Sequence, residues 1–407
     1  MKFIDGGVCA AQGFRAGGIH VGVKTHAAWK KDVALIVSDE DCACAAVYTK
    51  NAVKAAHIHV DKRHLADGKA RAAVINSGNA NACAPMGEEN AERVCAAAGK
   101  ALGCRPEDVV VAATGVIGQT LNVAVIEQGM PELCAAAAHT AAGSDAAAHA
   151  IMTTDTVKKE LAVETVIGGK TVRMGGIAKG SGMIHPNMGT MLCFLTTDCA
   201  ISSEMIKSAL LETVQVSFNR ISVDGDTSTN DTCCVLANGL AGNPVITEKG
   251  PDYNAFVEAL RALCVELAKK MASDGEGATH LITCTVTGAG SEQSAETVAK
   301  SVIGSALTKA AIFGADANWG RVLCAIGYSG AQVDVRRVDV AFASAAGRVE
   351  VCRDGAGIPF SEEEAKKVLG ADEIVIDILL RDGAAGAVAW GCDLTYDYVK
   401  INGDYRT

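Results

Sequence analysis

A glycine-rich segment followed by a threonine is the part of this sequence that most directly suggests chemistry. Residues 175–182 are rich in glycine, Gly189 and Thr190 follow, and an apolar run typical of a β-strand comes next. In such a layout the Thr190 hydroxyl attacks the Gly189 carbonyl in an N-to-O acyl shift, and hydrolysis of the ester frees an amino terminus at Thr190. Gly189 lacks a Cβ and so allows a strained conformation and a close approach. A glycine-rich turn before a buried strand would give the same pattern without cleavage.

A freed N-terminal threonine would carry its own base. Its α-amino group has a reference pKa of about 7.7 to 8.0 and can accept the hydroxyl proton near neutral pH. The GxSxG nucleophile elbow of α/β-hydrolases is missing from the sequence. No convincing Ser-His-Asp set is visible, and an N-terminal threonine does not need one.

A second candidate for chemistry is the pair Thr114 and Gly115, which ends an apolar run that starts at Val109. A hydroxyl followed by a glycine amide can supply two donors to an oxyanion. Removal of one such donor typically costs about 3 to 4 kcal/mol of transition-state stabilisation. Strands also commonly end at Thr-Gly because the turn requires it, so the pair alone does not establish an oxyanion hole.

Sequence motifs for phosphates and metals are missing. There is no GxxxxGKS/T loop, and the nearest GxGxxG approximation, residues 180–185, lacks the last glycine. Neither CxxC nor HExxH spacing occurs among the 16 cysteines and 9 histidines. His57 and His59 are expected on one face of a strand, where a solvent-facing pair is commoner than a metal site. We therefore expect neither a metal nor a nucleotide.

The composition excludes several classes of function. The 407 residues carry 37 Lys and Arg against 47 Asp and Glu, a net charge of −10 without a basic tract, which disfavours nucleic-acid and anionic-membrane partners. Apolar runs stay far below the roughly 20 residues of a membrane span. Residues 1–5 open no signal peptide, so we expect the cysteines to be buried thiols and the protein to be cytoplasmic.

Helix and strand signals alternate along the chain, which predicts an α/β protein. Apolar residues at helical spacing predict helices over 251–271 and 295–303. Ser361 and Glu364 form a capping box for a helix that ends near Gly370. Strands are expected at 109–111, 281–286, 333–342, 349–352 and 373–378. We find no linker, hinge or internal repeat.

Blocks of sequence spread over nearly the whole chain resemble the ornithine acetyltransferases, also called glutamate N-acetyltransferases, of arginine biosynthesis. The blocks are residues 13–16 (GFRA), 76–82 (NSGNANA), 153–156 (TTDT), 179–190 (KGSGMIHPNMGT), 222–232 (SVDGDTSTNDT), 314–321 (GADANWGR) and 397–407 (DYVKINGDYRT). Their order makes the resemblance specific. It favours a chemical role for Thr190, Thr114 and Gly115 over turn geometry alone.

The resemblance implies a proenzyme that cuts itself between Gly189 and Thr190. The products would be an α chain, residues 1–189, and a β chain, residues 190–407, which stay associated, usually as an α2β2 heterotetramer. The implied fold is an α/β sandwich of helices packed over central sheets (ornithine acetyltransferase/DmpA-like). Its topology is distinct from that of the N-terminal-nucleophile hydrolases that use the same chemistry.

The resemblance also implies roles for individual residues. Thr190 would be the nucleophile, and Thr114 with Gly115 the oxyanion hole. Lys179 suits a carboxylate and Glu276 the ammonium of ornithine. The full set of implied substrate contacts is Thr153, Lys179, Thr190, Glu276, Asn402 and Thr407.

The implied reaction is a ping-pong acyl transfer. N2-acetylornithine acylates Thr190, ornithine leaves, and glutamate attacks the acetyl ester to give N-acetylglutamate. No metal, nucleotide or prosthetic group is needed. Some members also accept acetyl-CoA as acyl donor, and the sequence does not separate the two kinds.

Some residues depart from the family pattern, and rival functions stay open. Gly189 stands where Ala is more usual, and His185 where a small apolar residue is expected. Cys193 is expected to be a strand residue rather than a second nucleophile. One rival is a self-cleaving N-terminal-nucleophile aminopeptidase or amidohydrolase, in which water replaces glutamate. The other is a non-catalytic binding or scaffold protein that kept the fold.

Overall fold

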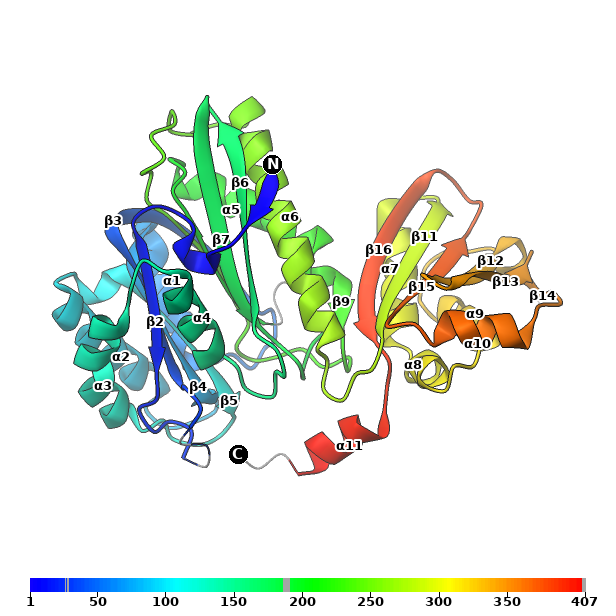
Figure 1. Ribbon diagram of the computed structural model, residues 1–407, viewed down its shortest axis with the longest axis horizontal. Helices are drawn as coiled ribbons and strands as arrows, with labels where there is room; N and C mark the ends of the chain where they lie inside the picture. Colours follow the sequence, from blue (N-terminus) through cyan, green and yellow to red (C-terminus); the bar gives the residue numbers. More distant parts are fainter. Residues whose placement is uncertain (26, 28, 186–190, 405–407) are drawn as a thin grey trace.

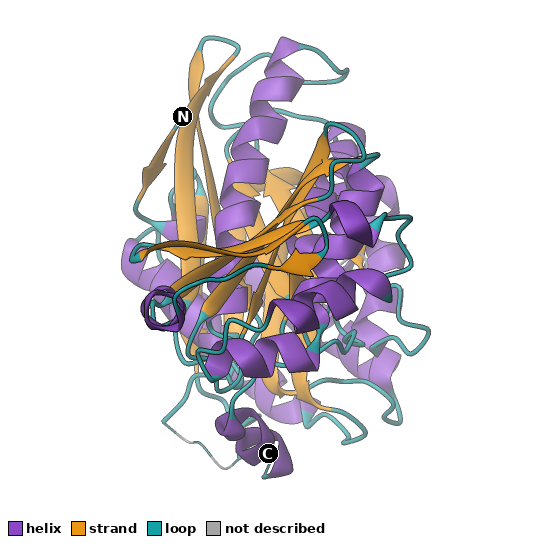
Figure 2. Cartoon of the chain, turned by 90° about the vertical axis from the view of Figure 1, so that its right-hand side faces the viewer, coloured by secondary structure: helices purple, strands orange, loops and turns teal. Residues whose placement is uncertain are grey.

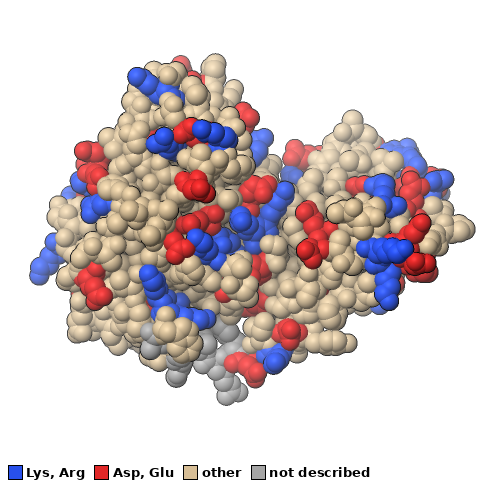
Figure 3. Space-filling model, viewed as in Figure 1, with Lys and Arg blue, Asp and Glu red and all other residues tan. Residues whose placement is uncertain are grey.

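The computed structural model describes residues 1–25, 27, 29–185 and 191–404, and it forms two lobes, each built on a β-sheet (Figure 1). The outline of the molecule is notched between the lobes, and acidic and basic side chains are interspersed over the visible face (Figure 3). Within these residues, no helix is both long and apolar enough to cross a membrane. The architecture is an α/β sandwich, as expected.

The first sheet has the strand order β1-β6-β7-β8-β10-β3-β4-β5, with β2 paired to β3. Its strands are β1 (Lys2–Ile4), β2 (Phe14–Ile19), β3 (Val33–Tyr48), β4 (Lys69–Asn79), β5 (Val109–Val116), β6 (Lys159–Ile167), β7 (Lys170–Lys179), β8 (Leu192–Thr197) and β10 (Thr232–Ala237). The helices of this lobe are α1 (Ala56–His64), α2 (Gly87–Leu102), α3 (Val123–Ala136), α4 (Ala141–Ala150), α5 (Ser203–Val216) and α6 (Pro251–Ser273).

The second sheet has the order β14-β13-β12-β15-β11-β16-β9. Its strands are β9 (Ile221–Ser222), β11 (Leu281–Ala289), β12 (Asp339–Ser344), β13 (Gly347–Arg353), β14 (Ala356–Gly357), β15 (Glu373–Leu379) and β16 (Ala385–Cys392). The helices are α7 (Glu292–Gly304), α8 (Ala306–Phe313), α9 (Trp319–Gly327), α10 (Glu362–Leu369) and α11 (Tyr396–Gly403). Figure 2 shows this sheet and its helices from the side.

Side chains that alternate along the strands bury both faces of the first sheet, whereas along β11, β13 and β15 of the second sheet they bury one face and leave the other half-buried or exposed. In β3, Val33 and Leu35 pack in the core formed with α1, α2 and α3, whereas Ala34 and Ile36 pack in the core formed with α4. In β16, Ala389 belongs to the core of the second lobe and Trp390 to the core that contains α5 and α6. The lobes therefore share apolar packing across α6.

The strand register places the ends of three neighbouring strands, β7, β8 and β10, side by side at one end of the first sheet. Lys179 of β7 lies opposite Leu192 of β8 in an antiparallel pair, and Leu192 lies opposite Thr232 of β10 in a parallel pair. Further along the same sheet, Thr114 of β5 lies opposite Ser77 of β4. These strand ends supply most of the site described below.

The long amphipathic helices were predicted correctly. α6 and α7 contain the apolar stripes read from the sequence, and their apolar side chains are buried. Ser361 Oγ accepts a hydrogen bond from Glu364 N at 3.2 Å and caps α10, which ends before Gly370. The strands predicted at 109–111, 281–286, 349–352 and 373–378 are also present, as β5, β11, β13 and β15.

Other predictions were wrong for identifiable local reasons. The strand expected at 333–342 begins only at Asp339, because Asp334 caps a 3₁₀ turn over Val335–Arg337. His57 and His59 lie on helix α1, not on a strand, so residues two apart face different sides: His57 is 1% exposed and His59 is exposed.

The cysteines are free thiols, and most are buried, as predicted. Five cysteines depart from the prediction, because Cys83 and Cys324 are exposed and Cys9, Cys104 and Cys134 are half-buried. Cys193 is a buried residue of β8, and burial raises the pKa of its thiol well above the ordinary value. It is therefore a strand residue, as expected.

Candidate active site

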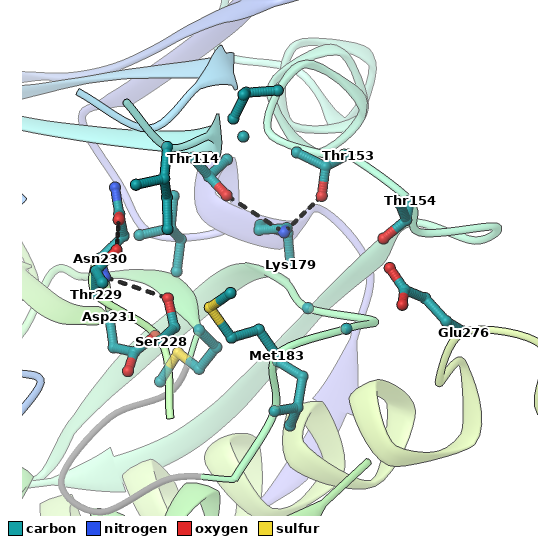
Figure 4. A pocket seen from close by; sticks show the side chains of 18 of the residues that line it. Thr114, Thr153, Thr154, Lys179, Met183, Ser228, Thr229, Asn230, Asp231 and Glu276 are labelled. Atoms are coloured by element: carbon teal, nitrogen blue, oxygen red, sulfur yellow. Dashed lines mark hydrogen bonds between the residues drawn. The ribbon is translucent and has the colours of Figure 1, made fainter. Parts of the chain in front are cut away.

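One cavity of about 320 Å³ gathers most of the predicted site residues (Figure 4). It lies at the ends of β5 and β7 and is completed by the loop before β10, the loop between α6 and β11, and α11. The predicted residues that line it are Thr114, Gly115, Thr153, Lys179, Glu276 and Asn402. Gly189, Thr190 and Thr407 lie outside the described residues. Met191, which follows Thr190 in the sequence, also lines the cavity.

The buried ammonium of Lys179 lies between two hydroxyl groups. Its Nζ donates to Thr153 Oγ1 at 2.7 Å and to Thr114 Oγ1 at 3.4 Å, the contacts dashed in Figure 4. Burial lowers the pKa of Lys179, and the Asp155 carboxylate 3.9 Å away opposes that effect. Because Thr114 Oγ1 accepts from Lys179, the hydroxyl hydrogen of Thr114 is left to donate elsewhere.

A buried ion network joins two sides of the cavity. Lys159 is fully buried, and its Nζ lies 2.6 Å from Asp155 Oδ1 and 2.5 Å from Asp274 Oδ2. Asp155 Oδ2 accepts from Thr153 N at 3.0 Å, and Asp274 lies two residues before Glu276. Burial alone would raise the pKa of Asp155, but the neighbouring lysine ammonium groups hold it below its usual value. Lys159 thus ties the Thr153 segment to the loop that carries Glu276.

The backbone at Thr114 and Gly115 is held in a position that requires glycine. Gly115 has a φ of +132°, and a Cβ on it would lie 2.3 Å from the carbonyl carbon of Gly78. The residue before Thr114 is fixed as well, because Asn230 Nδ2 donates to Ala113 O at 2.7 Å. This corner of the cavity is therefore positioned before any ligand arrives.

Glu276 supplies the acidic end of the cavity. It is 8% exposed, and its Oε2 accepts from Asn402 Nδ2 at 2.8 Å. Its backbone N donates to Ser181 O at 2.9 Å, and a Cβ on Gly182 would lie 2.4 Å from its carboxyl atoms, so the chain packs closely around it. A carboxylate has more acceptor positions than Asn402 uses, so Glu276 can receive an ammonium group from the cavity.

Asp231, just before β10, is a second acidic residue of the cavity. It is 1% exposed, and its Oδ2 has no hydrogen-bond partner among the described residues. Burial raises the pKa of Asp231 well above its ordinary value. A carboxyl group in this state can take up a proton inside the cavity.

Several lining residues were not predicted as site residues. Those that stand in the sequence blocks of the family resemblance, which was the available signal, are Thr154, Gly180, Gly182, Met183, Ile184, Ser228, Thr229, Asn230 and Asp231. Val116, Ile117, Met191 and Leu192 also line the cavity and lie outside these blocks. His185 does not line the cavity: its Nδ1 lies 3.0 Å from Ser222 Oγ, and burial lowers its pKa.

The part of the chain that the structure describes contains no group of three or more His, Cys, Asp or Glu side chains arranged to hold a metal ion. The polar side chains of the cavity are instead a mixture of hydroxyls, amides, one ammonium group and carboxyl groups, and apolar side chains such as Met183 and Leu192 complete the lining. Such a lining suits a small zwitterionic ligand and acyl chemistry on a hydroxyl.

Comparison with known proteins gives matches over nearly the whole length. The ArgJ family model matches residues 15–407. The arginine biosynthesis bifunctional protein ArgJ of Symbiobacterium thermophilum is 51% identical over 408 residues, which cover 100% of each protein.

Two solved structures are also similar to part of the chain. The arginine biosynthesis bifunctional protein argJ from Bacillus halodurans is 48% identical, with a TM-score of 0.48 over 52% of this chain and 97% of its own. Ornithine acetyltransferase complexed with ornithine, from Mycobacterium tuberculosis, is 36% identical, with a TM-score of 0.43 over 46% of this chain and 98% of its own. Because the family model and the bacterial relative match essentially from end to end, this chain belongs to the ArgJ family.

Proposed function

We propose that this chain is an acyltransferase of arginine biosynthesis that moves the acetyl group of N2-acetylornithine to glutamate through an acetyl ester on Thr190. The observation that carries the proposal is a single cavity that holds a buried ammonium, Lys179, and a buried carboxylate, Glu276, beside Thr114 and Gly115. N2-acetylornithine carries one carboxylate and one ammonium group, so this charge pattern suits it. The names of the relatives, a bifunctional arginine biosynthesis protein and an ornithine acetyltransferase, agree with this reaction.

In the first half-reaction the Thr190 hydroxyl attacks the acetyl carbonyl, and its proton passes to the Thr190 α-amino group. Negative charge develops on the carbonyl oxygen, where the Thr114 hydroxyl and the Gly115 amide would donate. The bond between the acetyl carbon and the ornithine nitrogen then breaks. That nitrogen takes the proton, and ornithine leaves as the free amine.

The second half-reaction reverses these steps with another amine. The α-amino nitrogen of glutamate attacks the acetyl ester, the same two donors hold the oxyanion, and the bond from the acetyl carbon to Thr190 Oγ1 breaks. The proton lost by the amine returns to the threonine oxygen. N-acetylglutamate leaves, and Thr190 is free for another cycle.

The proposed nucleophile exists only after cleavage between Gly189 and Thr190, which gives chains of residues 1–189 and 190–407. Strand β8 of the second chain pairs with β7 of the first, and Lys159 pairs with Asp274 across the same division. These contacts support two chains that stay associated after the cut. We propose an α2β2 assembly, with Thr153, Lys179, Glu276, Asn402 and Thr407 as substrate contacts.

Denaturing gel electrophoresis of freshly purified protein tests maturation and nucleophile together. The wild type should give two bands of similar size, and Thr190→Ala should give one uncut chain without activity. Thr190→Ser keeps a hydroxyl and serves as the matched control, which should still be cut. A single band from the wild type would contradict the proposal, and so would a cut Thr190→Ala protein.

The identity of the acceptor separates the acyltransferase from a hydrolase. With N2-acetylornithine as donor, ornithine release should be much faster when glutamate is present, and N-acetylglutamate should form in equal amount. Equal release with and without glutamate would assign the protein as an amidohydrolase instead. Gel filtration of the cut protein then tests the α2β2 assembly by its mass.

A further inference from the structure

The two amino acids of the proposed reaction carry opposite side-chain charges. The ornithine side chain ends in an ammonium group and the glutamate side chain in a carboxylate, so a subsite suited to one repels the other. Glu276 suits the first and would repel the second. A cationic surface within reach of the same acetyl ester would resolve this conflict.

A second cavity, of about 290 Å³, meets the active-site cavity at Gly115, Thr153 and Thr154, which line both. The segment after β2, the end of β4 and the residues after β5 form its other walls. These walls include Gly22, Lys24, Lys30, Asn79, Gln119 and Asn122. We call this space the lysine cavity.

The lysine cavity is basic in a protein of net charge −10. Its described lining contains two lysines and neither aspartate nor glutamate, whereas the active-site cavity contains Lys179 together with Asp231 and Glu276. An anionic side chain is therefore favoured on the lysine side of the shared rim over the Glu276 side. The contrast lies in charge, since the two spaces are similar in volume.

The two lysines are held differently. Lys24 Nζ donates to Met152 O at 2.8 Å and to Lys31 O at 2.9 Å, which fixes the ammonium beside the segment that carries Thr153. An ammonium has three N–H donors, so one remains for a ligand. Lys30 is exposed, and its Nζ makes no hydrogen bond or ion pair with any residue that the structure describes. Together they offer one fixed cation and one adaptable cation.

We propose that the lysine cavity binds the side-chain carboxylate of the acceptor glutamate, so that ornithine and glutamate approach the acetyl ester from opposite sides of the rim formed by Gly115, Thr153 and Thr154. This proposal rests on the proposed function. It makes Lys30 and Lys24 specificity-determining residues for one of the two half-reactions. The first half-reaction, in which N2-acetylornithine acylates the enzyme, does not use them.

The test separates the half-reactions in Lys30→Glu. We expect the KM for glutamate to rise at least about 10-fold, because a charge-assisted contact is lost and a repulsive charge is added. The burst of ornithine released from N2-acetylornithine without acceptor should not change, nor should exchange with labelled ornithine as acceptor. The matched control is Lys31→Glu, which changes an adjacent exposed lysine outside the lining. It should leave the KM for glutamate as in the wild type.

A second variant, Lys24→Met, tests the fixed cation, with its melting temperature measured to show that the protein is folded. It should also raise the KM for glutamate and spare the ornithine burst. A normal burst with unchanged KM for glutamate in both lysine variants would overturn the proposal. No burst in the wild type would instead contradict the proposed function.

The lysine cavity has the chemistry to bind the phosphates of an acetyl-CoA donor as well. A third experiment therefore distinguishes glutamate from acetyl-CoA as its ligand. Acetylation of glutamate is measured with acetyl-CoA and, separately, with S-acetyl-N-acetylcysteamine, which has no phosphate. A KM change in Lys30→Glu that is confined to acetyl-CoA would assign the cavity to the donor and overturn the proposal. A rise in the KM for glutamate with either donor supports it.

Discussion

The two walls of the active-site cavity are built in different ways. Thr114, Gly115 and Lys179 stand at the ends of β5 and β7, where the sheet and buried hydrogen bonds fix them, whereas Glu276 and Asn402 belong to a loop and to α11. Rigid strand ends suit groups that must stabilise a transition state in a fixed position, and loops suit groups that determine which ligand binds. We infer that the strand wall serves both half-reactions and the loop wall mainly recognises ornithine.

The largest effect is expected from removing the buried ion pairs of Lys159, which connect the two walls. Lys159→Met removes the buried ammonium that Asp155 and Asp274 share, and it leaves both carboxylates without their cation. Loss of one partner of a buried ion pair typically costs about 3–5 kcal/mol, so the free energy of unfolding should fall by that amount. Urea denaturation of the cut protein measures it.

The neighbouring lysine provides the control for this substitution. Lys158 pairs with Asp145 and Glu160, but its side chain is 36% exposed. Lys158→Met should therefore cost no more than about 1 kcal/mol. Equal losses in the two variants would show that burial of the network does not matter.

The strand wall is tested at Gly115. In Gly115→Ala a Cβ would meet the Gly78 backbone, and the positive φ disfavours any side chain, so the oxyanion donors should shift. We expect kcat to fall about 10²–10³-fold, the usual effect of losing one oxyanion donor, with little change in the KM for N2-acetylornithine. Steady-state rates of ornithine release with saturating glutamate measure this.

Gly118→Ala separates the contact from the backbone strain. Gly118 also has a positive φ, +83°, but a Cβ there would have open space. This variant should lose about 1 kcal/mol of stability and keep its kcat. If both alanine variants lose activity equally, the close approach of Gly115 to Gly78 is not what positions the donors.

The difference between the walls also explains what the sequence could predict. Amphipathic helices such as α6 follow from local periodicity, and Thr114 with Gly115 stood out because they end an apolar strand. Lys159 and Asp274 are 115 residues apart, and no spacing rule relates them. Asn230 likewise reaches Ala113 over 117 residues. Contacts that join distant segments were therefore not predicted, although the sequence blocks already contained Asp155 and Asn230.

Local sequence was also misleading in two places where a side-chain cap or burial in a helix overrode an alternating pattern. The run around 333–342 reads as a strand, but the Asp334 side chain accepts from Arg336 N and forms a turn instead. His57 and His59 fit the alternation of a strand, yet they belong to α1, where His57 is buried. Burial and side-chain capping determine the secondary structure of these two segments, and neither can be read from the spacing of residues alone.

The loop wall is tested by removing one charge. Glu276→Gln keeps the shape and the contact with Asn402 but cannot pair with an ammonium group. We expect the KM for N2-acetylornithine to rise about 10–100-fold, which corresponds to the loss of about 1.5–3 kcal/mol for a charged hydrogen bond. The KM for glutamate should not rise, because the substitution removes a charge that repels the glutamate side chain. Equal increases for both substrates would show that the walls do not divide recognition as inferred.

The smallest expected effect comes from titration of Lys24 in the lysine cavity. Burial, helped by the charges of Lys30 and Lys179 and opposed by those of Asp32 and Asp155, lowers the pKa of Lys24 to about 8. Because the charged form dominates only below that pKa, the charge on Lys24 falls from about nine-tenths to about one-tenth between about pH 7 and pH 9. The ratio of the KM for glutamate to the KM for acceptor ornithine should rise about 5- to 10-fold over this range. Lys24→Arg stays charged and should abolish the rise, so the same pH dependence in that variant would mean that another group titrates.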